Sequence, residues 1–469
     1  MRILITDGNE RSALAAARSL IAAGHEVHVA SRRRWSLAGA SRGARPCRLQ
    51  ADPLRDPCAY AREVGSLIDG LAIDMALPVT DASVEALLEH RNALPSRVHL
   101  PLPDLAAYRR ASDKVEMLEV ARTAGLAVPP TLVLETRAAG ERLPGPEFFP
   151  AVVKPHRSVI PGDGQHGERR KVGVSHVADA AACRAVLAGL PEGAFPVLLQ
   201  QRVHGPGEGL FGLRWNGRMV ATFAHRRLRE KPVEGGVSVY RESIAPPAEL
   251  VAAGRTLLAQ LGWQGVAMVE CKRDLATGRF VFMEVNGRLW GSLQLAIDAG
   301  VDFPALLVGC ALGAPVVPAA DYRVGVRSRW FWGDVDHLYL RLRDGNGATE
   351  GGGGRLAAVR DFLRFRPAAT GKRSGAGGTL CPSCSSHSPG LDWRVEPPSL
   401  AGRSAADGSQ EPPEFPHTRA VHTVQHEPVC GDPGQRLRRE VKSGRPVRRA
   451  HDADAPYDDR HEEGRARGR

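Results

Sequence analysis

The chain has 469 residues and a mass of 50.4 kDa, and at roughly 150 residues per domain this exceeds what one hydrophobic core usually organises. Its 43% of hydrophobic and 25% of charged residues indicate a globular protein and exclude a small disulfide-stabilised scaffold. The 63 Lys and Arg exceed the 52 Asp and Glu by 11, so a nucleic acid or another anionic partner has to be considered.

The first residues, Met1-Arg2-Ile3-Leu4-Ile5, lack the apolar run and the cleavage site of a signal peptide. A membrane helix needs roughly 18 uninterrupted apolar residues, and the best candidate, 306–320, is short and contains Pro315 and Pro318. Of the eight cysteines only Cys381 and Cys384 are closely spaced, which is typical of a reducing compartment. We therefore expect a cytoplasmic protein without a membrane partner.

The first part of the chain alternates apolar runs with helical patterns. A strand over 2–6, a helix over 12–23 that ends at Gly24, and a strand over 26–30 predict a β-α-β unit. Later, a strand over 75–80 leads into a helix over 84–94, which Thr80 or Asp81 can cap. This order predicts a doubly wound α/β domain over residues 1–105.

The next part begins with a linker over 101–105 and an amphipathic helix, capped by Ser112 or Asp113, that ends at Gly125. Strand patterns then outnumber helical ones. Strands are predicted at 131–134, 151–154, 171–177, 197–203, 209–215, 218–223, 265–272 and 280–285, and helices at 179–189, 247–261 and 293–299. Clustered strands with few helices favour an antiparallel α+β region.

The last part of the chain, 344–469, shows neither a helical nor a strand period. It contains Gly351-Gly352-Gly353-Gly354 and a mixture of Ser, Pro, Gly and Arg, which cannot bury an apolar face. We predict a disordered, low-complexity tail. A shifted reading frame in GC-rich coding DNA is a second explanation of the same composition.

Two carboxylates and a carboxamide form the pattern with the clearest chemistry. Glu284 and Asn286 project from one face of the strand over 280–285 and its continuation, because side chains alternate along a strand. If 266–272 and 280–285 pair as a hairpin, Glu270 lies on the same face. Hard oxygen ligands of this kind suit Mg²⁺ that carries phosphates. The alternative is the solvent face of an edge strand.

Basic residues accompany this pattern. Lys154 ends an apolar strand, where a point charge suits a phosphate, and the glycine-rich stretch up to Gly173 can form a flap over phosphates or an ordinary mobile hairpin. Further cations precede Gly235-Gly236, and they either hold an acceptor carboxylate or acyl phosphate or form a solvated strand end. These residues are His225, Arg226, Arg227 and Lys231.

The order of these motifs resembles the ATP-grasp superfamily, particularly its carbamoyl-phosphate-synthase-like, carboxylate–amine ligase branch. The motifs are Ser112-Asp113-Lys114, Val153-Lys154-Pro155, the run Leu198 to Val203, Glu270, and Glu284-Val285-Asn286-Gly287-Arg288. The resemblance implies a Rossmann-like pre-ATP-grasp domain over 1–105, followed by a two-subdomain ATP-grasp fold. The small subdomain with the glycine-rich flap would cover 106–200, and the large subdomain with the Mg·ATP site 201–343.

The resemblance also implies individual roles. Lys114 and Lys154 look like the nucleotide lysines, and Lys154 and Arg288 like the catalytic cations beside the transferred phosphate. Gln201 and Val203 would form the hinge that reads adenine, and Glu208 would lie near the ribose. Glu270, Glu284 and Asn286 resemble the ligands of Mg²⁺ or Mn²⁺. Gln201 stands where Glu is common, and Gly287 where Pro or Thr is frequent.

The implied function is an ATP- and Mg²⁺-dependent ligase that activates a carboxylate as an acyl phosphate for attack by an amine or a similar nucleophile. Its partners would be small-molecule carboxylate and amine substrates, and a homodimer is a candidate assembly. The alternative is a non-catalytic ATP-binding scaffold of the same fold. Nucleic-acid binding is not favoured, because no stretch interleaves aromatic and basic residues and no finger or helix-turn-helix spacing is present.

Overall fold

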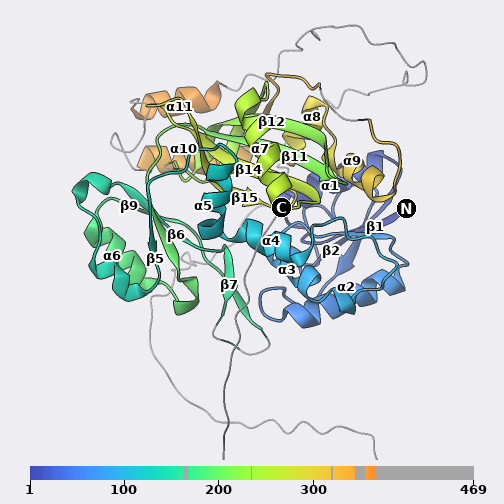
Figure 1. Cartoon of the computed structure of the whole chain (residues 1–469). Coiled ribbons are helices and arrows are strands. Elements are labelled where there is room, and N and C mark those ends of the chain that lie inside the picture. The colour runs from blue at the N-terminus through green and yellow to red at the C-terminus, as the bar shows by residue number, and fades with distance from the viewer. Residues whose placement is uncertain (163, 165–166, 234, 318–320, 344–353, 365–469) are drawn as a thin grey trace, which may run out of the picture. The chain divides into compact units, whose positions relative to one another are not determined.

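The computed structural model describes residues 1–162, 164, 167–233, 235–317, 321–343 and 354–364 (Figure 1). The predicted disordered tail, 344–469, lies outside these residues except for 354–364. In that short stretch the prediction is wrong, because helix α11 (Arg355–Leu363) forms there and packs against α10 (Phe331–Arg343). The partner helix supplies the contacts that the local sequence pattern does not reveal.

The N-terminal part contains a four-stranded parallel sheet in the order β3-β2-β1-β4. Successive side chains of β1 point to opposite faces of this sheet. Ile3 and Ile5 pack in a hydrophobic cluster with α1, whereas Leu4 packs in another cluster with α2 and α3. Helices therefore cover both faces of the sheet. The predicted doubly wound arrangement is therefore present. Its elements are β1 (Arg2–Ile5), α1 (Arg11–Ala22), β2 (Glu26–Ser31), β3 (Ala44–Arg48), α2 (Pro57–Gly70), β4 (Met75–Leu77), α3 (Asp81–Glu89) and η1 (Arg91–Ala93).

The middle part contains a four-stranded antiparallel sheet in the order β5-β10-β6-β9, with α6 packed on one face. A separate two-stranded hairpin, β7 with β8, projects beside it. The strand predicted over 171–177 is broken, because its first residue belongs to β8 and its last three form β9. The elements are β5 (Thr131–Leu134), η2 (Arg137–Glu141), η3 (Pro146–Phe148), β6 (Ala151–Pro155), β7 (Val159–Pro161), β8 (Arg169–Lys171), β9 (Ser175–Val177), α6 (Ala180–Gly189), η4 (Glu192–Ala194) and β10 (Val197–Gln201).

A six-stranded antiparallel sheet in the order β15-β14-β11-β12-β13-β16 forms the largest layer. The strands are β11 (Gly207–Trp215), β12 (Arg218–Lys231), β13 (Val237–Ile244), β14 (Gly265–Arg273), β15 (Phe280–Asn286) and β16 (Arg327–Arg329). The helices around it are α4 (Leu105–Ser112), α5 (Lys114–Thr123), α7 (Ala248–Gln260), α8 (Leu293–Ala299), α9 (Phe303–Ala311) and α10. The antiparallel sheets confirm the predicted class, α/β followed by α+β.

Two hydrophobic clusters cover opposite faces of the six-stranded sheet. Leu210 belongs to a cluster with α4, α5 and α7, whereas Phe211 belongs to a cluster with α8, α9 and the N-terminal helix α1. The second cluster also contains Ile3 and Val27 of the parallel sheet. The N-terminal sheet and the six-stranded sheet therefore share one core rather than meeting at a polar interface.

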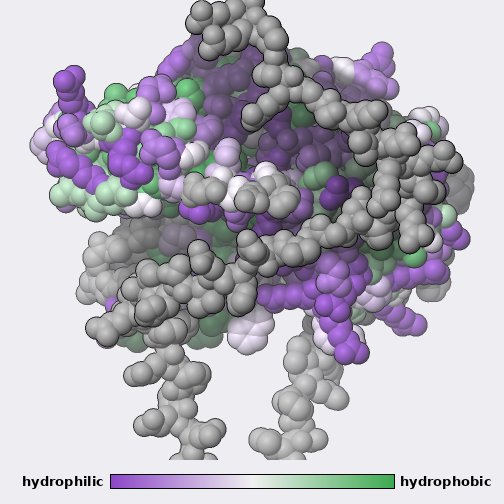
Figure 2. Space-filling view, turned by 90° about the horizontal axis from the view of Figure 1, so that it is seen from below, coloured by the Kyte–Doolittle hydropathy of each residue, from purple (hydrophilic) through white to green (hydrophobic). Residues whose placement is uncertain are grey.

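Hydrophilic residues occupy most of the coloured surface on the face shown in Figure 2, and hydrophobic residues appear there as smaller patches. Within the described ranges, no single helix is both long and apolar enough to cross a membrane. Helices α8 and α9 satisfy that test only when counted together, and they are bent by 90° at the break between them.

Candidate functional site

The two predicted acidic ligands lie opposite each other on neighbouring strands. In the β14–β15 ladder Glu270 pairs with Glu284 and Met268 pairs with Asn286, so Glu270, Glu284 and Asn286 share one face. A β-bulge follows Glu270 and shifts the register towards the hairpin end. The strand pairing that the sequence suggested is therefore present, and it places two carboxylates and one carboxamide together.

Two lysines approach these carboxylates from other elements. Asp113 caps α5 through the backbone N–H groups of Val115 and Glu116, and this cap fixes Lys114 at the start of the helix. The Lys114 Nζ lies 3.6 Å from a Glu284 oxygen and donates to Ser158 Oγ at 3.1 Å. Lys154, on β6, places its Nζ 3.9 Å from the sulfur of Met283. The site thus has two ammonium groups beside Glu284.

The surroundings of Lys154 change its acidity. Burial lowers the pKa of Lys154 to about 8, and the nearby Lys114 adds to this effect, while Glu284 and Glu270 oppose it. Each pKa unit is about 1.4 kcal/mol of preference between the two protonation states. A lysine in this environment binds its proton loosely until an anion, such as a phosphate, stabilises the charged form.

The two carboxylates have unlike partners. Arg227 of β12 contacts Glu270 at 2.6 Å and Glu230 at 2.8 Å, yet burial and the neighbouring Glu284 still raise the pKa of Glu270 above its ordinary value. Burial also acts against ionised Glu284, but Lys114, a hydrogen bond from Asn286 and Lys154 hold its pKa below the ordinary value. Of the two carboxylates, Glu270 is therefore the one whose negative charge is less fully balanced by its neighbours.

This donor set fits Mg²⁺. Carboxylate and amide oxygens are hard ligands, and a divalent cation between Glu270 and Glu284 would neutralise the repulsion that raises the pKa of Glu270. Among the residues that the structure describes, no group of three or more His, Cys, Asp or Glu side chains could hold a metal alone. Two carboxylates and one carboxamide leave coordination positions for the oxygens of a nucleotide.

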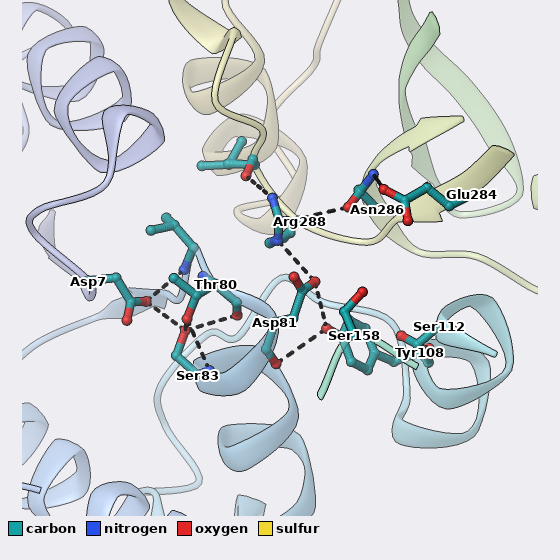
Figure 3. A network of polar contacts seen from close by, with 12 residues as sticks. Asp7, Thr80, Asp81, Ser83, Tyr108, Ser112, Ser158, Glu284, Asn286 and Arg288 are labelled. Carbon is teal, nitrogen blue, oxygen red and sulfur yellow. Dashed lines mark hydrogen bonds and ion pairs between the residues drawn. The ribbon is translucent and has the colours of Figure 1, made fainter. Parts of the chain in front are cut away.

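Arg288 connects this face to the N-terminal domain (Figure 3). Its Nε lies 3.0 Å from Asp81 Oδ1 at the start of α3, and its Nη2 donates to Asn286 Oδ1 at 3.3 Å. Tyr108 donates its hydroxyl to Asp81 Oδ1 at 3.3 Å. Burial acts against ionised Asp81, but Arg288 holds its pKa below the ordinary value. Asp81, the first residue of helix α3, therefore orients Arg288 from the N-terminal part of the chain.

The start of α3 is fixed by its own polar contacts. Thr80, and not Asp81, is the N-cap residue, since its side chain accepts from the Ser83 N–H and Ser83 completes the capping box. Ser83 also donates to Asp7 at 2.6 Å, and Asp7 accepts from Thr6 at 2.6 Å. The side chain of Asp81 is thereby left for Arg288, as Figure 3 shows.

A cleft opens between these elements. It is lined by residues of α3, α4, the start of α5, the segment after β6, and β15. They are Asp81, Glu85, Tyr108, Arg109, Ser112, Lys114, Arg157, Ser158, Val159, Glu284, Val285 and Asn286. The cleft therefore contains Lys114 and two of the three predicted metal ligands.

The predicted adenine and ribose residues lie apart from this cleft. Gln201 ends β10 and donates its side-chain amide to the Glu147 carbonyl at 3.3 Å, and the Val203 carbonyl accepts from Lys272 at 3.2 Å. Glu208 is 2% exposed and pairs with Arg226 at 2.8 Å. In the ladder Glu208 pairs with Cys271 and Gly209 with Glu270, so Glu208 points to the other face of the sheet. The nucleotide roles of these three residues stay predictions.

The basic segment on β12 is a solvated strand end only in part, because His225 is buried and Arg227 half-buried, whereas Arg226 is exposed. His225 is 1% exposed, and its Nε2 contacts Ser292 Oγ at 2.8 Å. Burial, Arg227 and Arg241 hold the pKa of His225 well below its ordinary value, so this histidine is neutral at pH 7. Arg226 and Lys231 form ion pairs with Glu208 and Asp336.

Sequence reasoning missed the partners of the predicted residues. Asp81 was considered only as a cap, and Tyr108 and Lys272 were not considered at all. The sequence did not separate Arg227 from the three other cations of its segment. In the structure its guanidinium crosses β11 and contacts Glu270. Gly207 makes this crossing possible, because a Cβ on it would lie 2.7 Å from Arg227 Cδ. The only signal in the sequence was the glycine between two strongly patterned strands.

Comparison with known proteins supports this description. Residues 197–331 match the family model described as ATP-grasp in the biosynthetic pathway with Ter operon. This match covers β11, β12, β14 and β15, which carry Arg227, Glu270, Glu284 and Asn286. None of the curated protein sequences matches the chain.

Solved structures similar to this chain include pyruvate carboxylase from Rhizobium etli, with a TM-score of 0.52 and 17% identity over 70% of this chain and 29% of that one. Biotin carboxylase from Campylobacter jejuni has a TM-score of 0.52 and 15% identity over 69% of this chain and 74% of that one. L-amino acid ligase from Bacillus licheniformis has a TM-score of 0.50 and 16% identity over 66% and 74%. Identities this low show a common fold and nothing about substrates.

Proposed function

We propose that the chain is an ATP-grasp protein, an ATP- and Mg²⁺-dependent ligase that activates a carboxylate as an acyl phosphate for capture by an amine or a similar nucleophile, because residues 197–331 match an ATP-grasp family model. The observation that carries this proposal is the pairing of Glu270 with Glu284 beside Asn286, Lys114 and Lys154. Two carboxylates that repel each other next to two ammonium groups suit a polyanion bound through a divalent cation.

The chemistry needs positioning and charge neutralisation rather than a protein nucleophile. An oxygen of the substrate carboxylate attacks the γ-phosphorus, the bond to the β-phosphate oxygen breaks, and ADP leaves. The amine nitrogen then attacks the acyl carbon, phosphate departs, and the nitrogen loses a proton. A Mg²⁺ ion held by Glu270, Glu284 and Asn286 would offset the negative charge that develops on the phosphate.

The chain's own residues have separate tasks in this scheme. Glu270, Glu284 and Asn286 would hold the metal, while Lys114 and Lys154 bind phosphate oxygens. Arg288 lies on the Asn286 side, held by Asp81, where it can balance charge on the transferred phosphate. Arg227 shares Glu270 with the metal and keeps that carboxylate ionised.

A second candidate function is a non-catalytic ATP-binding scaffold. Such a scaffold would have the same fold and the same nucleotide lysines. Its paired carboxylates would bind the metal and nucleotide without taking part in a reaction. The retention of Glu270, Glu284, Asn286 and Arg288 in one place favours the ligase. The homodimer and the cytoplasmic location stay predictions.

The direct test is release of ADP and phosphate from Mg·ATP, screened with pooled carboxylates against pooled amines. Glu284→Gln keeps the shape of the side chain and removes its charge, so we expect kcat to fall by about 100-fold or more. Glu249→Gln, an exposed substitution on α7, is the matched control and should leave turnover unchanged.

The outcomes separate the candidate functions. Turnover that requires Mg²⁺, one acid and one amine together supports the ligase. Tight binding of Mg·ATP by the wild type without turnover of any acid would favour the scaffold. Salt-dependent retention of DNA or RNA without nucleotide binding would contradict both.

A further inference from the structure

A second group of cations lies on the same face of the six-stranded sheet, beyond the carboxylates. Arg241 of β13 pairs in register with Arg227 of β12 and with Ser328 of β16. It is 4% exposed, and its Nη atoms donate to the Ser238 carbonyl and to Ser328 Oγ. Its buried Nε has no hydrogen-bond partner, and no carboxylate of the described residues forms an ion pair with it.

Arg11 approaches Arg241 from the N-terminal domain. It is the first residue of α1, and its guanidinium lies over the ring of Trp330 at 4.1 Å and against Gly291. Its Nη1 is buried without a partner, and it forms no ion pair within the described part of the chain. Burial lowers the pKa of Arg241 to about 9, and Arg11 and Arg227 add to this effect, while Asp298 opposes it. Two like charges are thus held close together by the fold.

Other polar groups around this pair also lack partners. His225 Nδ1, Trp290 Nε1 and Ser238 Oγ are buried and without a hydrogen bond in the described structure. The ring of Phe211 lies 4.5 Å from that of His225 and 4.6 Å from that of Trp290, so the two polar rings belong to one cluster. Buried donors are almost always satisfied in folded proteins, and several such donors in one place indicate a ligand.

The free-energy cost of burying unpaired charges also indicates an anion at this cluster. A buried charge without a partner costs several kcal/mol, and replacing such a group with an apolar one often stabilises a protein. Ion pairs with Glu230 and Glu270 offset this cost for Arg227, whereas Arg11 and Arg241 have no acidic partner among the residues that the structure describes. Glu10 acts on the pKa of Arg11, and Asp298 on that of Arg241, and each favours the charged form of the arginine. An anion that enters with the substrate would supply the missing charge.

We propose that Arg11 and Arg241, with His225, Ser238 and Trp290 as further hydrogen-bonding groups, bind a carboxylate of the substrate that does not itself react. This inference rests on the proposed ligase function and names its substrate class. Neutral His225 can accept or donate one hydrogen bond, and Trp290 donates one. Two guanidinium groups supply the charge and the forked donors that recognise a carboxylate.

The position of this cluster of cations relative to the metal residues sets the role of the carboxylate. Arg241 lies three strands from Glu270, or about 14 Å across the sheet. The carboxylate held there is thus separate from the group that meets the γ-phosphate. Two sources are chemically equivalent: a second carboxylate on the acid that is activated, or the carboxylate of an amino acid whose amine is the nucleophile.

The test compares variants of the full chain in steady-state kinetics and calorimetry. Arg241→Gln and Arg11→Gln should each raise the KM for the anchored substrate by about 100-fold and change the KM for ATP by less than threefold. Arg218→Gln, an exposed substitution on β12, is the matched control. Arg241→Met should keep or raise the melting temperature while it loses carboxylate binding, which a purely structural arginine would not do.

Substrate analogues identify the source of the carboxylate. Replacing glutarate or succinate by butyrate removes the second carboxylate of the acid, and replacing an amino acid by its amide removes that of the nucleophile. The analogue that loses affinity for the wild type, but not for Arg241→Gln, identifies the anchored partner. Unchanged KM values for every substrate in both arginine variants would overturn the proposal.

The experiments also distinguish failure of the proposed ligase function from failure of the carboxylate site. If no acid and amine pair supports turnover, calorimetry with glutarate, succinate and L-glutamate still measures carboxylate binding at Arg11 and Arg241 without ATP. Binding by the wild type that Arg241→Gln loses would support the carboxylate site alone. Absence of any carboxylate binding, with Mg·ATP binding intact, would overturn the site and leave the nucleotide residues unaffected.

Discussion

Lys154 couples the chemistry of the site to pH. Its ammonium group is buried beside Lys114, and its pKa is about 8 in the protein without nucleotide. An unfolded lysine keeps its proton to about pH 10.4. Because the unfolded state binds the extra proton between these values, this lysine makes the free protein more stable as pH rises through that window. Phosphate binding has the opposite requirement, since it needs the charged form.

We therefore expect the affinity for Mg·ATP to fall above pH 8, by up to about tenfold per pH unit when one proton is required. The ordinary pKa of arginine lies about 2 units or more above that of lysine, so Lys154→Arg should keep its charge to a higher pH and show a smaller fall, whatever its affinity at pH 7. The dissociation constant for Mg·ATP, measured from pH 6.5 to 9.5, checks both statements. An equal fall in the two proteins would assign the titration to another group.

Among individual residues, Glu270, Glu284 and Asn286 could be predicted from the sequence to share one face, but the residues that contact them could not. Strand alternation alone places Glu284 and Asn286 together, and a short hairpin connection brings Glu270 beside them. The contact of Asp81 with Arg288 joins residues 207 positions apart in the chain, and no local period encodes it. Arg11 and Arg241 could not be recognised for the same reason.

Among the elements, the segment after β15 is constrained by what it packs against. The resemblance to ATP-grasp proteins left Gly287 as a departure from a position where Pro or Thr is frequent. A Cβ at Gly287 would overlap the ring of Trp263 and would lie 3.2 Å from Tyr108. Trp263 is fully buried, and its Nε1 donates to the Val266 carbonyl at 3.2 Å. Only glycine therefore lets the segment after β15 pass this close to the tryptophan.

Gly287→Ala should lower the free energy of unfolding by about 1–3 kcal/mol, because overpacking a filled core forces neighbouring groups to move. The change should also reduce kcat, since Arg288 follows directly. Denaturant unfolding and kinetics measure the two effects. Gly189→Ala, at the end of α6, is the control, because a Cβ there meets nothing within 4 Å. Wild-type stability in Gly287→Ala would contradict the packing argument.

Element prediction succeeded where a pattern is local. The strands over 151–154 and 280–285 appear nearly as predicted, as β6 and β15. The sequence did not reveal β13 or β16, because β13 carries arginine and glutamate among its apolar residues and β16 has only three residues, two of them arginine. Their strand character comes from the neighbouring strand, and so does that of β3, which is largely exposed.

For the molecule as a whole, the shared core predicts cooperative unfolding. Ile3, Val27 and Ala13 of the N-terminal part lie in one hydrophobic cluster with Phe211 and Leu295 of the later part. Separate domains usually meet through smaller and more polar interfaces. We expect one calorimetric transition for residues 1–343, with equal calorimetric and van't Hoff enthalpies. A first transition confined to the N-terminal sheet would contradict this expectation.

The sharing of that core limits which parts of the protein can be exchanged. A chimaera that replaces the first 104 residues by the corresponding domain of a structurally similar protein would lose Arg11 and Asp81 as well as half of an apolar interface. Under the proposed function, one polypeptide segment would contribute to phosphate chemistry through Asp81 and to substrate choice through Arg11. Natural variation in substrate should accordingly require paired changes at the start of α1 and on β13, and engineering of either strand or helix alone should fail.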